Sequence, residues 1–92
     1  MMHGEASRKV PDGKLVNVEV DYSDRFENVD IRGDFFIEPP NALEIIESKI
    51  EGLSADAGKE EVLEELSVVD ADLIGFSREV IVDVLFEAQG RD

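Results

Sequence analysis

The sequence predicts an α+β fold, with a small antiparallel β-meander of three to four strands packed against about three α-helices. Residues 14–20 largely alternate apolar and polar side chains, which is typical of a half-buried strand. After Pro40 the apolar residues instead recur at spacings of three and four, which is typical of amphipathic helices. The chain has only 92 residues, and a chain of that length builds one small core. We therefore predict a single domain over residues 1–92.

The strands fall in the first half of the chain. We expect residues 1–6 to form a flexible tail and residues 7–38 to form the meander. A turn is predicted at 11–13, Pro-Asp-Gly, because proline fixes φ at the first corner of a turn and glycine can adopt a positive φ near its end. Residues 7–10 can then pair with the strand at 14–20. The apolar face of that strand carries Val16, Val18 and Val20.

Two further segments extend the meander. Residues 26–32 follow a polar turn and place Val29 and Ile31 at period two, as expected for a strand with one buried face. Residues 35–38 either continue that strand beyond a bulge at Gly33 or form another short strand.

The helical part is predicted over residues 40–90. Its first helix begins near Pro40, which suits a first helical turn, and stops at Gly52. The core stripe of this helix consists of Leu43, Ile46 and Ile50, and its water-facing side consists of Glu44, Glu47 and Glu51. A loop over residues 54–58 leads to a short second helix at 59–66. The inward side chains of the second helix are Val62, Leu63 and Leu66.

A third helix is predicted over residues 78–88, although the segment is rich in β-branched residues that would also suit a strand. The terminal signals favour a helix. Ser77 is a good N-cap, Glu79 is favourable in the first turn, and Gly90 is a suitable C-terminal stop.

The chain is strongly acidic. Its 23 Asp and Glu residues outnumber nine Lys and Arg residues, which gives a net charge of −14. Such a surface repels phosphate backbones and anionic lipids, so neither nucleic acid nor a membrane is a predicted partner. Molar salt, where the Debye length is about 3 Å, would relieve the repulsion among the carboxylates. Two interpretations stay open, namely adaptation to a salt-rich cytoplasm and an acidic surface kept for solubility.

Several classes of chemistry are excluded by the residues that the chain lacks. The absence of cysteine excludes disulfides, thiolate metal sites and thiol chemistry. His3 is the only histidine and lies in the expected tail, so no zinc or iron site is predicted. No phosphate-binding loop, nucleophile elbow, signal peptide or run of about 20 apolar residues is present. We predict no catalytic residue and no metal ligand in a soluble, cytoplasmic chain.

The run Gly33-Asp34-Phe35-Phe36, followed by Ile37, is a candidate binding segment. Neighbouring side chains of a strand point to opposite faces, so if Phe36 enters the core, Phe35 and Ile37 face away from it. We therefore predict Phe36 as the core anchor and Phe35 with Ile37 as a contact surface. The alternative is a β-bulge followed by two core aromatics.

Lys14 is a second candidate. It follows a turn that contains glycine, where a flexible ammonium group can reach an anionic ligand. The alternative is a strand-edge lysine that only discourages aggregation.

Three runs of residues, taken in order, resemble a known family. They are KVPDGKLV at 9–16, IRGDFF at 31–36 and IEGL at 50–53, the last at the end of the first predicted helix. Over residues 8–53 this order is similar to the C-terminal accessory domain of lipoate-protein ligases. Where Asp12-Gly13-Lys14 stands here, related domains often have Gly-Gly-Lys, and Asp12 offsets part of the local positive charge.

The resemblance implies a function. In that family the domain either follows the catalytic domain in one chain or is a separate small protein, the archaeal type, that pairs with a catalytic subunit. The short chain, which begins with Met, leads us to expect the second arrangement, a heterodimer. The small domain is then needed for the formation of lipoyl-adenylate. It would bind no cofactor alone, because ATP, Mg²⁺ and lipoate would lie at the partner's site.

The resemblance also suggests roles for the two candidates. Gly33, Asp34, Phe35 and Ile37 would form the docking surface for the catalytic subunit, and Lys14 would point toward the nucleotide. Two alternatives stay open at this point. One is a non-catalytic acidic interaction module unrelated to lipoate. The other is a carrier domain of the lipoyl or biotinyl type with a modified Lys14, although such domains are nearly all β.

Overall fold

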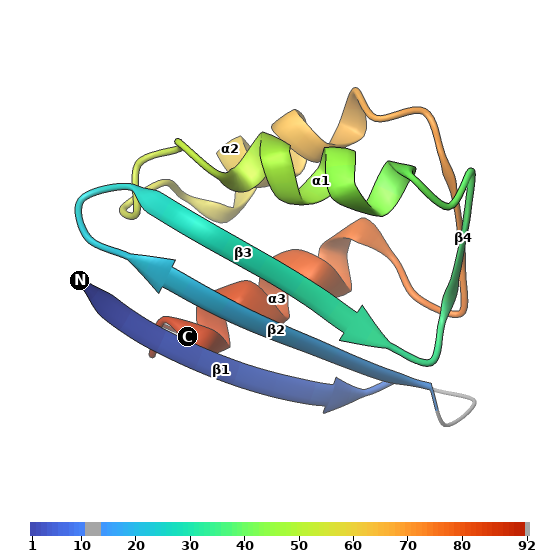
Figure 1. Cartoon of the computed structure of the whole chain (residues 1–92), viewed down its shortest axis with the longest axis horizontal. Coiled ribbons are helices and arrows are strands. Elements are labelled where there is room, and N and C mark those ends of the chain that lie inside the picture. Colours follow the sequence, from blue (N-terminus) through green and yellow to red (C-terminus); the bar gives the residue numbers. More distant parts are fainter. Residues whose placement is uncertain (11–13, 92) are drawn as a thin grey trace.

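The computed structural model describes residues 1–10 and 14–91, where three helices cover one face of a three-stranded antiparallel sheet (Figure 1). A separate two-stranded sheet lies at one end of the molecule. In chain order the elements are β1 (Met2–Lys9), β2 (Leu15–Tyr22), β3 (Phe26–Gly33), β4 (Phe36–Glu38), α1 (Ala42–Ile50), α2 (Lys59–Ser67), β5 (Asp72–Ile74) and α3 (Arg78–Ala88). The predicted α+β class is confirmed. The turn expected at 11–13 lies outside the described residues.

The large sheet has the strand order β1-β2-β3, and alternation of side chains fixes which face is buried. In the central strand Val16, Val18 and Val20 are almost fully buried, as predicted. Val29 and Ile31 of β3 continue the same buried face, because they lie next to Val20 and Val18 in the antiparallel register. Helix α3 packs against β1 and β2, α1 packs along β3, and α2 contacts both of the other helices. Within the described residues no helix is long and apolar enough to cross a membrane.

The strand β1 corrects the expectation of a flexible tail over residues 1–6. All eight of its residues pair with β2, from Met2 opposite Tyr22 to Lys9 opposite Leu15. The sequence gives little sign of this strand, because few of its residues are apolar and backbone pairing supplies most of its order. Gly4 permits the packing, since a Cβ at this position would collide with the carbonyl oxygen of Ala88 in α3.

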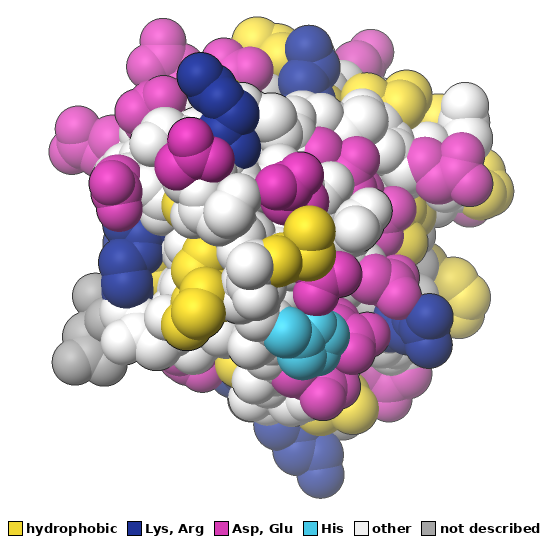
Figure 2. Space-filling model, turned by 60° about the vertical axis from the view of Figure 1, so that its left-hand side comes forward, with side chains coloured by type: hydrophobic (Ala, Val, Ile, Leu, Met, Phe, Trp, Pro, Cys, Tyr) yellow, Lys and Arg dark blue, Asp and Glu magenta, His cyan; other side chains and the backbone are white. Residues whose placement is uncertain are grey.

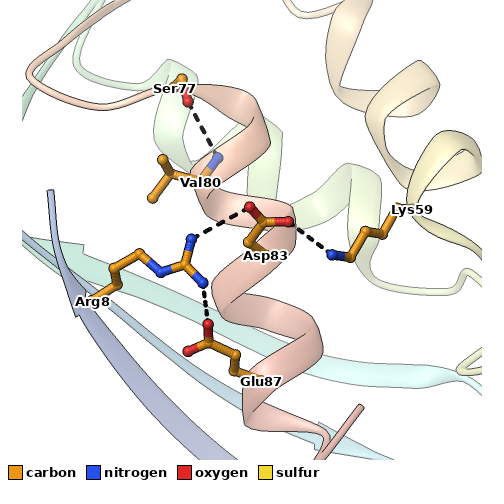
Figure 3. Close-up of polar contacts among 6 residues, drawn as sticks. All are labelled: Arg8, Lys59, Ser77, Val80, Asp83 and Glu87. Atoms are coloured by element: carbon orange, nitrogen blue, oxygen red, sulfur yellow. Dashed lines mark hydrogen bonds and ion pairs between the residues drawn. The ribbon is translucent and has the colours of Figure 1, made fainter. Parts of the chain in front are cut away.

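Polar contacts fasten α3 to its neighbours (Figure 3). Arg8 of β1 donates to Asp83, with an N–O distance of 3.4 Å, and to Glu87 one turn further along α3. Lys59 of α2 approaches the same Asp83 carboxylate at 3.0 Å. One carboxylate therefore links α3 to both β1 and α2.

The ends of the helices follow the predicted signals. The hydroxyl oxygen of Ser77 accepts a hydrogen bond of 3.2 Å from the backbone N–H of Val80, so Ser77 is the N-cap of α3. Gly52 and Gly90 have φ values of +93° and +80°, as expected for residues that stop a helix. The first helix begins at Ala42, two residues later than Pro40 suggested.

Of the three glutamates expected to face water, Glu44 and Glu51 are exposed, whereas Glu47 of α1 is half-buried, which corrects a second expectation. The carboxylates of Glu47 and Glu51 accept hydrogen bonds from the backbone N–H groups of Ile31 and Val29, at 2.8 Å and 3.0 Å. These donors lie on the outer edge of β3, where no further strand is present in the described chain. The two carboxylates therefore occupy an edge that could otherwise pair with another strand. Burial raises the pKa of the Glu47 carboxyl, although the hydrogen bond from Ile31 acts in the opposite direction.

Candidate functional site

The candidate site is built on the two-stranded sheet, here called the β4–β5 ribbon. Its register places Phe36 opposite Ile74, Ile37 opposite Leu73 and Glu38 opposite Asp72. The fourth strand thus leaves the meander and pairs with β5, a strand that the sequence patterns did not predict. The middle pair faces the core, while the outer pairs face solvent.

The orientation of the two phenylalanines is opposite to the prediction. Phe36, expected in the core, is 66% exposed, whereas Ile37, expected at a contact surface, is buried. Phe35 is half-buried and stacks on Phe76, with 3.9 Å between ring centroids and an interplanar angle of 20°. The alternation along β4 was expected, but the pairing with β5 decides which of its faces turns inward.

Gly33 and Asp34 hold the start of this segment against the large sheet. A Cβ at Gly33 would collide with the carbonyl oxygen of Leu15 and would lie 2.7 Å from the ring of Phe35. The carboxylate of Asp34 accepts a hydrogen bond of 2.5 Å from the backbone N–H of Leu15. Both residues are exposed, and both fix the position of Phe35 in this chain.

Lys14 lies beside the ribbon. Its Nζ is 5.9 Å from the centroid of the Phe36 ring, a distance typical of a cation–π contact. Its methylene groups pass Gly75, where a Cβ would be 3.2 Å from the Cγ of Lys14. The glycine has a φ of +92°, so it supplies both the turn after β5 and the space for the lysine. The structure therefore brings together Lys14 and the aromatic run, which are far apart in the sequence.

A largely apolar groove of about 450 Å³ adjoins Phe36, between the end of β3, β4 and the start of α1. Its apolar lining consists of Ile31, Phe35, Phe36, Ile37, Pro40 and Leu43. Arg32 and Glu38 also border the groove. Together the groove, the exposed Phe36–Ile74 pair and Lys14 offer apolar contact with charged groups beside it. These are the properties of a binding surface.

A second hollow, of about 350 Å³, lies on the uncovered face of the large sheet around His3. The imidazole lies 2.6 Å from Asp21 and 3.1 Å from Glu19, and Figure 2 shows the histidine bordered by acidic side chains. The hydrogen bond to Asp21 is the largest cause that raises the pKa of His3, and it lowers the pKa of Asp21. No group of three or more His, Asp or Glu side chains in residues 1–10 and 14–91 is arranged to hold a metal ion.

Sequence reasoning missed Ile74 and Phe76, and the reason is the length of their segment. The strand β5 has only three residues, too few for a periodicity to be recognised. The glycine between Ile74 and Phe76 was the available signal, because it marks a turn between two apolar residues.

Comparison with known proteins identifies a shared fold. No protein-family model and no curated protein sequence matches the chain. Among solved structures, the chain is similar to one in a structure of an archaeal lipoylation system from Thermoplasma acidophilum, a bi-partite lipoate protein ligase and its E2 lipoyl domain. The TM-score is 0.72 at 22% sequence identity, and the match covers 91% of this chain and 97% of that chain. At this identity, the similarity establishes the fold.

Proposed function

We propose that this chain is an accessory subunit of a lipoate-protein ligase, required with a catalytic subunit for the ATP-dependent activation of lipoate to lipoyl-adenylate. The supporting observation is the fold that it shares, over 91% of its length, with a chain from an archaeal bi-partite ligase system. The sequence runs that resemble the accessory domain include Lys14 and residues 33–36, which meet in space beside the β4–β5 ribbon.

The division of labour follows from what the reaction needs. Attack of the lipoate carboxylate on the α-phosphate of ATP builds negative charge, which requires fixed cations and exclusion of water. In this proposal ATP, Mg²⁺ and lipoate bind to the catalytic subunit, and the accessory subunit closes over them through the ribbon. In this proposal Lys14 faces the nucleotide; its aliphatic stem passes Gly75 and its Nζ lies 5.9 Å from the centroid of the Phe36 ring.

The carrier-domain alternative fits the structure less well. Carrier domains of the lipoyl and biotinyl type are nearly all β, whereas three helices cover the sheet here. A carrier lysine must also project freely, whereas the stem of Lys14 is packed. The acidic interaction module is the second candidate, because an exposed Phe36–Ile74 pair would serve any docking partner.

One assay separates these functions. Lipoate-dependent release of pyrophosphate from ATP is measured for the catalytic subunit, with and without this chain, and the chain is then weighed by mass spectrometry. Stimulation of the release supports the accessory subunit. A mass gain on Lys14 would instead indicate a carrier domain. If neither stimulation nor a mass gain is observed, the acidic interaction module is the function that remains.

A further inference from the structure

The outer face of the β4–β5 ribbon has two chemically different ends. Because side chains alternate along a strand, one face carries the solvent-exposed residues Phe36, Ile74, Glu38 and Asp72. The apolar pair Phe36–Ile74 lies at one end, next to Lys14, and the acidic pair Glu38–Asp72 lies at the other. Two residues of a strand span about 7 Å, so both pairs fit within one interface footprint.

Glu38 and Asp72 form the acidic end of the ribbon. Glu38 and Asp72 are direct cross-strand partners, an arrangement in which like charges repel. They border a hollow of about 300 Å³ that also contains Asp70. No Lys or Arg among the described residues forms an ion pair with any of these three carboxylates.

The two arginines nearest to them in the sequence have other partners. Arg32, which borders the apolar groove together with Glu38, pairs with Asp30 at 2.7 Å. Arg78 donates to the backbone carbonyl oxygens of Leu66, Val69 and Ala71, at 3.1, 2.7 and 3.3 Å. Its guanidinium group therefore organises the segment before β5 and leaves the carboxylates of Asp70 and Asp72 facing solvent. These carboxylates are therefore free to contact basic side chains of a partner.

We infer that the ribbon docks in one orientation on a protein surface with an apolar hollow for Phe36 and Ile74, and with Lys or Arg side chains beside it for Glu38 and Asp72. The partner is the catalytic subunit, so this inference rests on the proposed function. The cation at the Phe36 end and the anions at the Glu38 end make the ribbon electrically polar. A reversed orientation would bring the partner's basic groups against Lys14, which fixes the direction of docking.

The test uses the full chain with Glu38→Gln and Asp72→Asn together, titrated into the catalytic subunit of the same organism. The dissociation constant should rise about tenfold, as expected for the loss of two charge pairs at the rim of an interface. Added NaCl should weaken binding of the wild type more than binding of the variant, because salt screens charge pairs that only the wild type forms with the partner. In the absence of the partner, the urea midpoint of the variant should equal or exceed that of the wild type, since a repulsive pair is removed.

The matched control is Glu64→Gln with Glu65→Gln on α2, which removes the same charge elsewhere and should leave the dissociation constant unchanged. Equal weakening by both double variants would assign the effect to net charge and overturn the inference. Unchanged affinity and salt dependence of the ribbon variant, or a lower urea midpoint for it, would also overturn the inference. Binding of the wild type without stimulation of pyrophosphate release would overturn the proposed function alone, whereas no binding at all would overturn both.

Discussion

Phe36 is the side chain whose removal tests the docking surface most directly. It is 66% exposed in the free chain, and an aromatic side chain covers about 200 Å², so about 130 Å² is left for a partner to cover. At about 25 cal/mol per Å², and allowing for the methyl group of alanine, Phe36→Ala should weaken association by about 2 to 3 kcal/mol. This free energy corresponds to a rise of about 30- to 140-fold in the dissociation constant.

The free chain should lose less, because only about a third of the side chain is already buried. We expect the free energy of unfolding to fall by about 1 kcal/mol, measured by urea denaturation. The assay is a titration of wild-type or variant chain into the catalytic subunit, with lipoate-dependent pyrophosphate release as the signal. Saturating concentrations of Phe36→Ala should recover most of the rate, since the lost contact acts on association.

Met2→Ala is the matched control for this substitution. Met2 is 60% exposed and lies at the start of β1, at the opposite end of the sheet from the ribbon (Figure 1). Its replacement should leave the titration unchanged. A dissociation constant for Phe36→Ala within about twofold of that for Met2→Ala would refute the assignment of the ribbon as the docking surface.

Three further substitutions test other parts of the structure. Gly33→Ala should lower the free energy of unfolding by about 1 to 3 kcal/mol, because its Cβ would collide with the carbonyl oxygen of Leu15. Gly58→Ala is the control, because its Cβ would lie in open space. Equal urea midpoints for the two variants would contradict the close approach at Gly33. Lys14→Met keeps the aliphatic stem and removes the charge, so the rate of lipoyl-adenylate formation at saturating concentrations of this chain should fall about tenfold. An unchanged rate would show that Lys14 does not face the nucleotide. Burial raises the pKa of Glu47, so the stability linked to this carboxyl is fully present below its unfolded pKa and is lost as the pH rises through the folded value. Glu47→Gln does not titrate, so its free energy of unfolding relative to the wild type should increase between about pH 4 and about pH 7, and a difference independent of pH would argue against a raised pKa.

Sequence patterns over a few residues predicted the structure correctly wherever neighbouring residues determine it. The alternation through Val18 defines the buried face of β2, because successive side chains of a strand point to opposite faces. The helix α3 was also predicted correctly, because the N-cap at Ser77 and the C-terminal glycine at Gly90 favour a helix more strongly than the β-branched residues between them favour a strand. Helix-terminal signals lie within a few residues of the backbone groups that they satisfy, so they can be recognised without the tertiary fold.

The candidate site depended on contacts that are distant in the sequence, and there the prediction was only partly correct. The spacing in the run at 33–37 fixed the alternation of β4 but not its direction, which pairing with β5 decides. The burial of Ile37 and the stacking of Phe35 on Phe76 both follow from that long-range choice. The strand β1 was missed for a related reason, because its order comes from backbone pairing with β2 and from the close approach of α3 at Gly4.

The chemistry of the ribbon favours reversible docking. Full burial of the exposed parts of Phe36 and Ile74 would contribute about 3 to 5 kcal/mol, whereas association costs about 4 to 15 kcal/mol in lost freedom of motion. The acidic pair adds orientation and association rate more than affinity. In the proposed function, additional contacts, such as one between Lys14 and the nucleotide on the catalytic subunit, would be needed to hold the closed state. An accessory subunit of this kind would close when the substrates of the adenylation step are present. It would open once they are consumed, which gives the bulky acceptor protein access to the lipoyl-adenylate.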